Sequence, residues 1–344
     1  MLGIAHAEGS ATMDSQGGFS TGLALFALEA SRPFGTRVAA VLGLVLDAHE
    51  ERSFEDGEHK TRPLISVRGR DVYVVHSLFG ERGQSANDKL VRLLFFAGAL
   101  KDASAGRITA MIPYLAYARK DRKTQPRDPV NTRYVAQLFE AIGVDRIVTL
   151  DVHNLAAYQN AFRCRNEHLE AAPLLVRHLA PSLREDSPIV VSPDAGGIKR
   201  ADAFRRRLGS ALQQSIALGF VEKYRSQGRI TGEAFTGDVE GKVAVIVDDL
   251  ISSGATMARA ALACRTRGAI RVIGVATHGL FGADAGSVLG GDAFDRLVVT
   301  DSVASTRVST AAFDAKLERV NVAGLFAEAI RRLHNDGSLV ELDE

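Results

Sequence analysis

The stretch VAVIVDDLISSGATMARAALACRTRGA, residues 243–269, decides the fold class because it joins a strand pattern to a helix pattern. Residues 243–247 are all apolar and mostly β-branched, which is typical of a strand buried in a parallel sheet. The residues from 255 onward predict a helix that closes at Gly268. The turn at 252–254 consists of Ser, Ser and Gly, and the first amide groups of a helix favour an anion at such a turn. The stretch therefore predicts a strand, an anion-binding turn and a helix.

Six further runs along the chain have the composition of buried strands. They are DVYVVHS (71–77), RITAMIPY (107–114), RIVTLDVH (146–153), PIVVSPD (188–194), RVIGVATHG (271–279) and RLVVTDS (296–302). Amphipathic segments separate many of them, such as NTRYVAQLFEAIG, which ends at Gly143. This alternation predicts an α/β protein with mostly parallel sheets flanked by helices. Ligands of such folds bind beyond the carboxyl ends of the strands, where this chain carries Asp151, His153, Asp194 and His278.

Length and composition exclude several classes of protein. The 344 residues are enough for two α/β domains of roughly 150 residues each. The net charge is +1, and the chain has no long basic run, so we expect no nucleic-acid partner. The longest apolar run, VAAVLGLVL, is too short to cross a bilayer, so we expect no membrane partner.

The cysteines and the amino terminus indicate where the protein works. Cys164 and Cys264 lie a hundred residues apart without a metal-binding spacing, which suits a reducing cytoplasm. Residues 1–18 have no basic start and no apolar core, so they do not resemble a secretory signal. We expect residues 1–20 to be a disordered extension of a cytoplasmic protein.

Asp248 and Asp249 precede the anion-binding turn, although carboxylates repel a phosphate. Carboxylates do accept hydrogen bonds from hydroxyl groups, and they can bind Mg²⁺. A ligand with a diol at one end and a phosphate at the other would satisfy both halves of the motif, and a five-carbon sugar 5-phosphate has that shape. A purely structural alternative is that the acids and the small residues only cap the helix.

Several motifs resemble those of the ribose-phosphate pyrophosphokinases, or phosphoribosyl pyrophosphate (PRPP) synthetases. VIVDDLISSGAT resembles a ribose-phosphate binding motif that this family shares with phosphoribosyltransferases. Five more segments occur in the order and at the spacing of the synthetase: SFEDGEHKTRPLISVRGRDVYVVHS, GRITAMIPYLAYARKDRK, VDRIVTLDVHN, IVVSPDAGGIKRA and LFAEAIRRLHN. The resemblance runs from about residue 22 to residue 337. It implies transfer of the diphosphoryl group of ATP to O1 of ribose 5-phosphate, which gives PRPP and AMP.

The resemblance also implies a domain organisation. Two similar phosphoribosyltransferase-type domains, 21–167 and 168–321, would enclose the active site between them. The last helix, expected at 322–336, would return to pack on the first domain.

The resemblance assigns residues to the ribose 5-phosphate side of the site. Those implied to bind the sugar phosphate are Asp194, Arg225, Asp248, Asp249, Ser252, Ser253, Gly254, Ala255 and Thr256. The segment FVEKYRSQGRITGEAFTGDV leaves an apolar strand and is rich in Gly, Thr and Ser. The resemblance implies that its Lys223 and Arg225 belong to a mobile catalytic loop. The alternative for this segment is an ordinary charged surface loop.

The ATP side of the site also rests on the resemblance. The implied ATP-binding residues are Phe54, Asp56, Gly57, Glu58, Arg119, Lys120 and His153. Lys120 stands where the family commonly has Gln. Mg²⁺ is the implied cofactor, with His153, Asp194 and Asp151 as its expected ligands, although imidazole is an unusual ligand for this hard cation. The FEDGE loop would reach ATP on a neighbouring subunit, so the resemblance implies a homo-oligomer, a hexamer in the family.

Two alternative functions stay open. A phosphoribosyltransferase would share residues 248–256 but would not need the FEDGE and YARKDRK segments. A non-catalytic regulatory homologue of the synthetase would be expected to lose catalytic side chains, yet Lys223, Arg225, His153 and Asp194 are all present.

Overall fold

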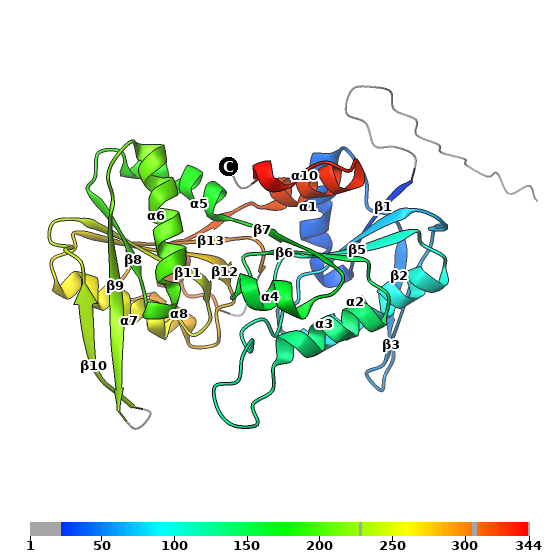
Figure 1. Cartoon of the computed structure of the whole chain (residues 1–344), viewed down its shortest axis with the longest axis horizontal. Coiled ribbons are helices and arrows are strands. Elements are labelled where there is room, and N and C mark those ends of the chain that lie inside the picture. Colours follow the sequence, from blue (N-terminus) through cyan, green and yellow to red (C-terminus); the bar gives the residue numbers. More distant parts are fainter. Residues whose placement is uncertain (1–21, 227–228, 305–307, 343–344) are drawn as a thin grey trace, which may run out of the picture.

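A computed structural model describes residues 22–226, 229–304 and 308–342, with the backbone alone at 223–226, 229–233 and 341. The extension expected at 1–20 lies outside the described residues. Two sheets lie side by side along the long axis of the molecule, with helices above and below them (Figure 1). All seven predicted strand runs form strands of these sheets, which confirms the α/β class.

The first sheet has five parallel strands in the order β1-β4-β5-β6-β7. Their bounds are Leu23–Ala27, Asp71–Val75, Arg107–Ile112, Arg146–Leu150 and Arg165–Leu169. Because β7 pairs with β6, this sheet extends past residue 167, where we expected the domain to end. The boundary was misplaced because the sequence of β7, RNEHL, is mostly polar and carries no strand pattern.

The second sheet has seven strands in the order β10-β9-β8-β11-β12-β13-β14, and only the β9–β10 pair is antiparallel. The bounds of β8 to β14 are Pro188–Ser192, Ala217–Ser226, Arg229–Thr236, Val243–Ile251, Arg271–Gly279, Arg296–Thr300 and Leu317–Val320. β2 (His49–Ser53) and β3 (His59–Pro63) form a separate antiparallel hairpin beside the first sheet.

Within the described residues, ten α-helices cover the sheets, and three apolar cores lie beneath them. α1, α5, α6 and α10 share one core that continues from the first sheet to the second. α2, α3 and α4 cover the other face of the first sheet, while α7, α8 and α9 cover the other face of the second. Their bounds, from α1 to α10, are Arg32–Leu42, Ala86–Asp102, Asn131–Ala141, Leu155–Ala161, Ala172–Leu179, Ile198–Leu212, Ala255–Thr266, Ala285–Leu289, Ala311–Asp314 and Ala323–His334.

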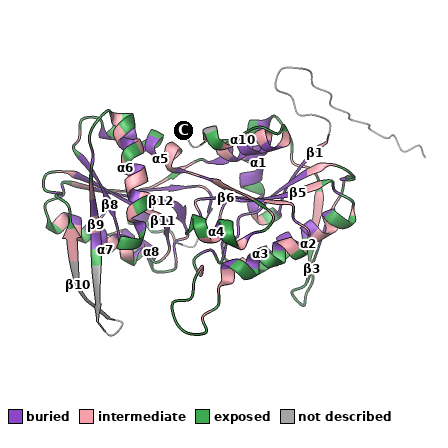
Figure 2. Ribbon diagram, viewed as in Figure 1, coloured by how far each residue is buried: buried purple, intermediate pink, exposed green. Residues whose placement is uncertain are grey.

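Burial follows from this layered arrangement. Figure 2 shows buried strands at the centre of the molecule and helices whose outer faces are exposed. Successive residues of a strand point to opposite faces, so Leu25 and Phe26 of β1 enter different cores. Within the described residues, no helix is both long enough and apolar enough to cross a bilayer.

The last helix returns to the first domain and fixes the two domains together. The Phe326 ring of α10 packs edge-on against Phe34 of α1, with ring centroids 5.5 Å apart. At the end of α10, His334 Nδ1 lies 2.8 Å from an Asp71 carboxylate oxygen of β4. Because α10 follows β14 of the second sheet, these contacts connect the domain that carries β11 to the first domain.

Candidate active site

A cleft of about 1080 Å³ opens between the two domains. Its floor lies beyond the carboxyl ends of β6, β8 and β11, where polar residues follow the buried strands. The first domain contributes Arg119, Arg122 and His153 to the lining. The second domain contributes Asp194, Asp248 and the turn after β11. Four of the motif segments, those around residues 119, 153, 194 and 248, thus meet across one cavity.

Asp248 and Asp249 end the buried run of β11 and differ in exposure. The Asp249 side chain is 3% exposed and that of Asp248 is 20% exposed. Burial and the neighbouring charge of Asp249 raise the pKa of Asp248. Burial also opposes the charge on Asp249, but the His153 hydrogen bond and the Arg200 guanidinium outweigh it and lower the pKa of Asp249. Asp249 is therefore the firmly ionised member of the pair.

Arg200 neutralises this acidic pair, a role that was not predicted from the sequence. It lies in the first turn of α6, three residues after Gly197. Its Nη1 atom lies 3.1 Å from Asp248 Oδ1 and 3.2 Å from Asp249 Oδ1. A buried acidic pair requires a nearby cation, and the basic residues of GGIKRA were the signal that could have revealed it.

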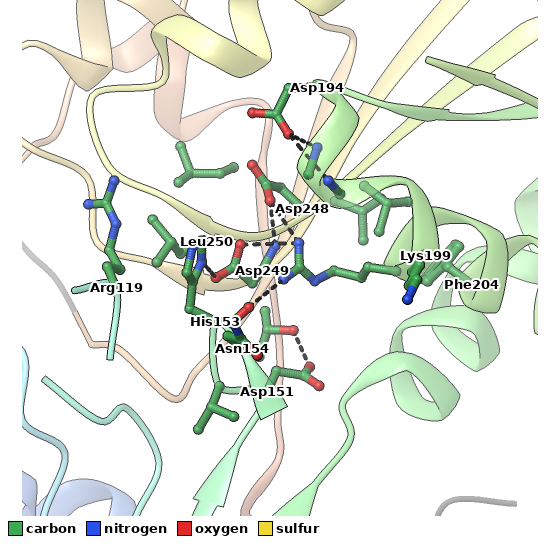
Figure 3. A pocket seen from close by; sticks show the side chains of 18 of the residues that line it. Arg119, Asp151, His153, Asn154, Asp194, Lys199, Phe204, Asp248, Asp249 and Leu250 are labelled. Atoms are coloured by element: carbon green, nitrogen blue, oxygen red, sulfur yellow. Dashed lines mark hydrogen bonds and ion pairs between the residues drawn. The ribbon is translucent and has the colours of Figure 1, made fainter. Parts of the chain in front are cut away.

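His153 joins the two domains through its imidazole ring. Its Nδ1 atom lies 2.7 Å from Asp249 Oδ2, and the hydrogen bond to Asp249 raises its pKa. The His153 side chain is 42% exposed and lines the cleft. Figure 3 shows the ring beside both carboxylates, with Arg119 and Asp194 on different sides of this group.

The turn after β11 has the backbone of an anion site. Gly254 adopts a left-handed conformation with φ of 81° immediately before α7. A Cβ atom there would lie 2.7 Å from the Leu289 side chain, so only glycine fits. Ser252, Ser253, Gly254 and Thr256 line the cleft. Ala255 is exposed but is not among the described residues that line it.

The three expected metal ligands do not come together. Asp194 Oδ1 accepts hydrogen bonds from the Gly196 and Gly197 amides, at 3.0 and 3.2 Å. Asp151 Oδ2 accepts from the Ala171 amide at 3.1 Å and from the Thr277 hydroxyl. The described residues contain no group of three His, Cys, Asp or Glu side chains that could hold a metal ion. The resemblance places His153 on the ATP side and Asp194 near the sugar phosphate, so these two positions are not required to form one cluster, and the assignment of Mg²⁺ ligands stays a prediction.

Of the two cations expected to bind ATP, only one faces the cleft. Arg119 is exposed and lines it, as does Arg122, which was not predicted. Lys120 Nζ instead lies 2.5 Å from Asp128 Oδ2 and 3.1 Å from the Thr124 hydroxyl. The expectation for Lys120 does not fit this geometry, because Asp128 holds its ammonium group within the 120–128 loop.

The FEDGE segment is the turn of the β2–β3 hairpin and lies apart from the cleft. Phe54 is 41% exposed, and the Arg52 guanidinium carbon lies 5.1 Å from the centre of its ring. The Glu58 amide donates to Asp56 Oδ1 at 3.1 Å, and Gly57 has a φ of 91°. None of Phe54, Asp56, Gly57 and Glu58 is among the described residues that line the cleft.

The segment expected to be a catalytic loop has the backbone of a hairpin. β9 pairs with β10 in antiparallel register, with residue 223 opposite 233 and residue 225 opposite 230. Residues of high strand propensity, such as Phe220, Val221 and Phe235, explain why this segment is not an irregular loop. The side chains of Lys223 and Arg225 lie outside the described residues. Glu222, the residue before them, lines the cleft, so β9 reaches its edge.

Comparison with known proteins gives this geometry its context. Residues 23–143 match the model of the N-terminal domain of ribose phosphate pyrophosphokinase. Residues 166–284 match a phosphoribosyl transferase domain, and residues 231–343 match a phosphoribosyl synthetase-associated domain. The ribose-phosphate pyrophosphokinase of Vibrio vulnificus (strain YJ016) is 36% identical over 317 residues, which cover 92% of this chain and 97% of the relative. The chain belongs to the ribose-phosphate pyrophosphokinase family.

Other members of the family agree over the same length. The ribose-phosphate pyrophosphokinase of Wolinella succinogenes is 35% identical over 322 residues, or 93% of this chain and 99% of the relative. The crystal structure of phosphoribosylpyrophosphate synthetase from Mycobacterium smegmatis superposes with a TM-score of 0.82 at 32% identity. It covers 92% of this chain and all of the other. The similarity therefore extends over nearly the whole length of these three relatives.

Proposed function

We propose that this chain transfers the diphosphoryl group of ATP to O1 of ribose 5-phosphate, giving PRPP and AMP. The observation that carries the proposal is the pairing of two unlike walls in one cleft. The second domain offers a carboxylate and an anion-binding turn, while the first domain offers Arg119 and Arg122. A sugar phosphate suits the wall of the second domain, and a nucleoside triphosphate suits the wall of the first domain.

On the sugar side, Asp248 is the acceptor for the diol, because it is the more exposed of the two acids. The turn of Ser252, Ser253, Gly254 and Thr256 receives the 5-phosphate at the start of α7, where amide groups favour an anion. Asp194 lines the same cleft, and we assign it to the sugar side of the site.

We assign Mg²⁺ on the ATP side to His153, and we assign Asp194 to Mg²⁺ near the sugar. Metal-binding histidines usually donate their other ring nitrogen to a carboxylate, and His153 Nδ1 has such a partner in Asp249. Mg²⁺ is commonly held by one or two protein ligands together with substrate phosphates, so the separated positions of His153 and Asp194 fit it. When bound, Mg²⁺ would neutralise phosphate charge.

The chemistry then follows from position and charge. O1 of the sugar attacks the β-phosphorus and loses its proton, the bond from that phosphorus to the α,β-bridging oxygen breaks, and AMP leaves. Asp248 orients the sugar so that O1 faces phosphorus, and Arg119 holds the phosphates. Phosphoryl transfer depends mainly on such positioning and on stabilising charge as it develops. We assign that stabilisation to Lys223 and Arg225.

The assay that tests this function measures AMP release. Purified protein with ATP, Mg²⁺ and ribose 5-phosphate should release AMP, and omission of ribose 5-phosphate should abolish the release. A phosphoribosyltransferase would consume PRPP and release no AMP in this mixture. A non-catalytic homologue would give no AMP although it bound both substrates. We place the reaction in the cytoplasm, because it consumes ATP and because Cys164 and Cys264 are both free thiols.

We also propose that the active form is a homo-oligomer with ATP sites shared between subunits. Phe54, Asp56 and Glu58 lie in the turn of the β2–β3 hairpin, and none of them is among the described residues that line the chain's own cleft. We assign them to ATP bound by another copy. A mixture of a Glu58→Ala variant and a Lys223→Ala variant, each inactive alone, should therefore regain part of the wild-type activity through mixed sites.

Subunit exchange must be verified before that mixture is interpreted. Mass spectrometry of differently labelled variants would show whether mixed oligomers form. Mixed oligomers without any recovered activity would contradict shared sites. The matched control mixes the Glu58→Ala variant with the double variant Glu58→Ala/Lys223→Ala. Every subunit then lacks Glu58, so no complete site can form.

A further inference from the structure

Arg200 is the only arginine that the structure places on both acids of the cleft within the described residues. Its Nη1 atom lies within 3.2 Å of one oxygen of Asp248 and one of Asp249. Its Nη2 atom donates to the His153 carbonyl oxygen at 3.4 Å. One guanidinium group thus contacts both halves of the acidic pair and the loop after β6 of the other domain.

Both carboxylate oxygens of Asp249 already have side-chain partners. Its Oδ1 faces Arg200 and its Oδ2 faces His153 at 2.7 Å. Its side chain is 3% exposed. The two acids therefore differ in what they can do: Asp249 holds neighbouring side chains, and Asp248 is the one that a ligand in the cleft can reach.

Asp248 is held from two sides. Its Oδ1 accepts from Arg200 at 3.1 Å and from the Asp249 backbone amide at 2.9 Å. Two like charges in a partly buried site repel each other unless a cation lies between them. Without Arg200, the carboxylate of Asp248 would lose its neutralising partner and one of the two hydrogen bonds that orient its Oδ1.

We propose that Arg200 is a positioning residue, which together with Asp249 fixes Asp248 in the orientation that accepts the sugar diol. This inference rests on the proposed function, because it names how the ribose 5-phosphate side of the same cleft is prepared. A rigid acceptor binds its ligand more tightly than a mobile one, since less ordering is left for the binding step. The guanidinium is suited to the task, because its planar fork can meet several acceptors at once.

The opposite role would be a placeholder. If the guanidinium merely filled the position of the diol, then ribose 5-phosphate would have to displace it, and removal of Arg200 would tighten binding. The contacts argue against this, because Arg200 also bonds the His153 carbonyl and the buried Asp249, neither of which a sugar in the cleft would replace.

A double-mutant cycle distinguishes a positioning role from general damage. Ribose 5-phosphate binding is measured by calorimetry with Mg²⁺ and α,β-methylene ATP, an analogue that cannot give up its diphosphoryl group. We expect Arg200→Gln to weaken ribose 5-phosphate binding about tenfold or more while binding of the ATP analogue changes much less. In an Asp248→Asn background, Arg200→Gln should weaken ribose 5-phosphate binding by less than about threefold, because the carboxylate that Arg200 positions is already absent.

Arg206→Gln is the matched control. Arg206 lies on the same helix, its side chain is 63% exposed, and it pairs with Asp202 four residues before it. The Arg206→Gln variant should bind ribose 5-phosphate with the affinity of the wild type. If Arg200→Gln does not fold, as judged by its thermal midpoint, Arg200→Lys replaces it and should show a smaller but selective loss.

Unchanged or tighter ribose 5-phosphate binding by the Arg200 variant would overturn the inference, and so would a loss that adds in full to that of Asp248→Asn. Parallel losses for both ligands would also contradict it, since a positioning role on the sugar side is selective. Failure of the proposed function would look different, because then the wild-type protein itself would not bind ribose 5-phosphate or release AMP.

Discussion

Lys223→Ala and Arg225→Ala are each expected to lower kcat by roughly 10²–10³, the scale on which losing one charge-stabilising group slows an enzyme. Both residues lie on β9, and Glu222, the residue before Lys223 on the same strand, lines the cleft. Cations at this edge can act on the charge that develops around the β-phosphorus without binding ground-state ATP. Such contacts raise turnover more than affinity, so the KM for ATP should change much less than kcat.

Steady-state kinetics at saturating Mg²⁺ measures this effect. Lys223→Arg should restore little activity, because a planar fork does not replace a compact ammonium group. Lys242→Ala removes the same charge from a lysine that pairs with exposed Asp238, and it should behave as the wild type. If both alanine variants on β9 turn over within a few-fold of the wild type, this hairpin is an ordinary surface feature.

Asp248→Asn is expected to weaken ribose 5-phosphate binding by about 10- to 100-fold, the range for one lost hydrogen bond to a charged group. The substitution keeps the shape of the side chain and removes its charge. Because Asp248 serves the sugar and not the nucleotide, affinity for an ATP analogue should remain close to that of the wild type.

Calorimetry with each ligand separately checks the second prediction. Asp238→Asn is the matched control, since Asp238 is a 76% exposed carboxylate outside the cleft lining. Equal ribose 5-phosphate affinity in Asp248→Asn and in the wild type would remove Asp248 from the sugar site. A loss for both ligands would mean that the substitution disturbs the domain junction instead.

The central strands could be predicted because their residues face helices on both sides. β11 and β12 are almost continuous apolar runs, and such runs indicate buried parallel strands. Edge and hairpin strands such as β2 and β7 could not be predicted in this way. Their sequences, HEERS and RNEHL, are polar because much of their surface faces water, and only pairing with a neighbouring strand fixes them.

The site was predictable where it follows directly from a strand and was not where it depends on tertiary contacts. Asp248 and the turn to Thr256 are local continuations of β11 and α7. Arg200 lies 48 residues before Asp248 on another element, so no local pattern reveals its contact. The pairing of Lys120 with Asp128 likewise depends on how the loop between them closes.

The measurement that tests the central claim most directly follows the β-phosphorus of ATP. Wild-type protein is incubated with ATP labelled at that phosphorus, Mg²⁺ and ribose 5-phosphate, and the products are separated. Diphosphoryl transfer predicts that the label moves to the sugar product and that unlabelled AMP appears in equal amount. Label that stays on the nucleotide as ADP, or the absence of any transfer, would contradict the account.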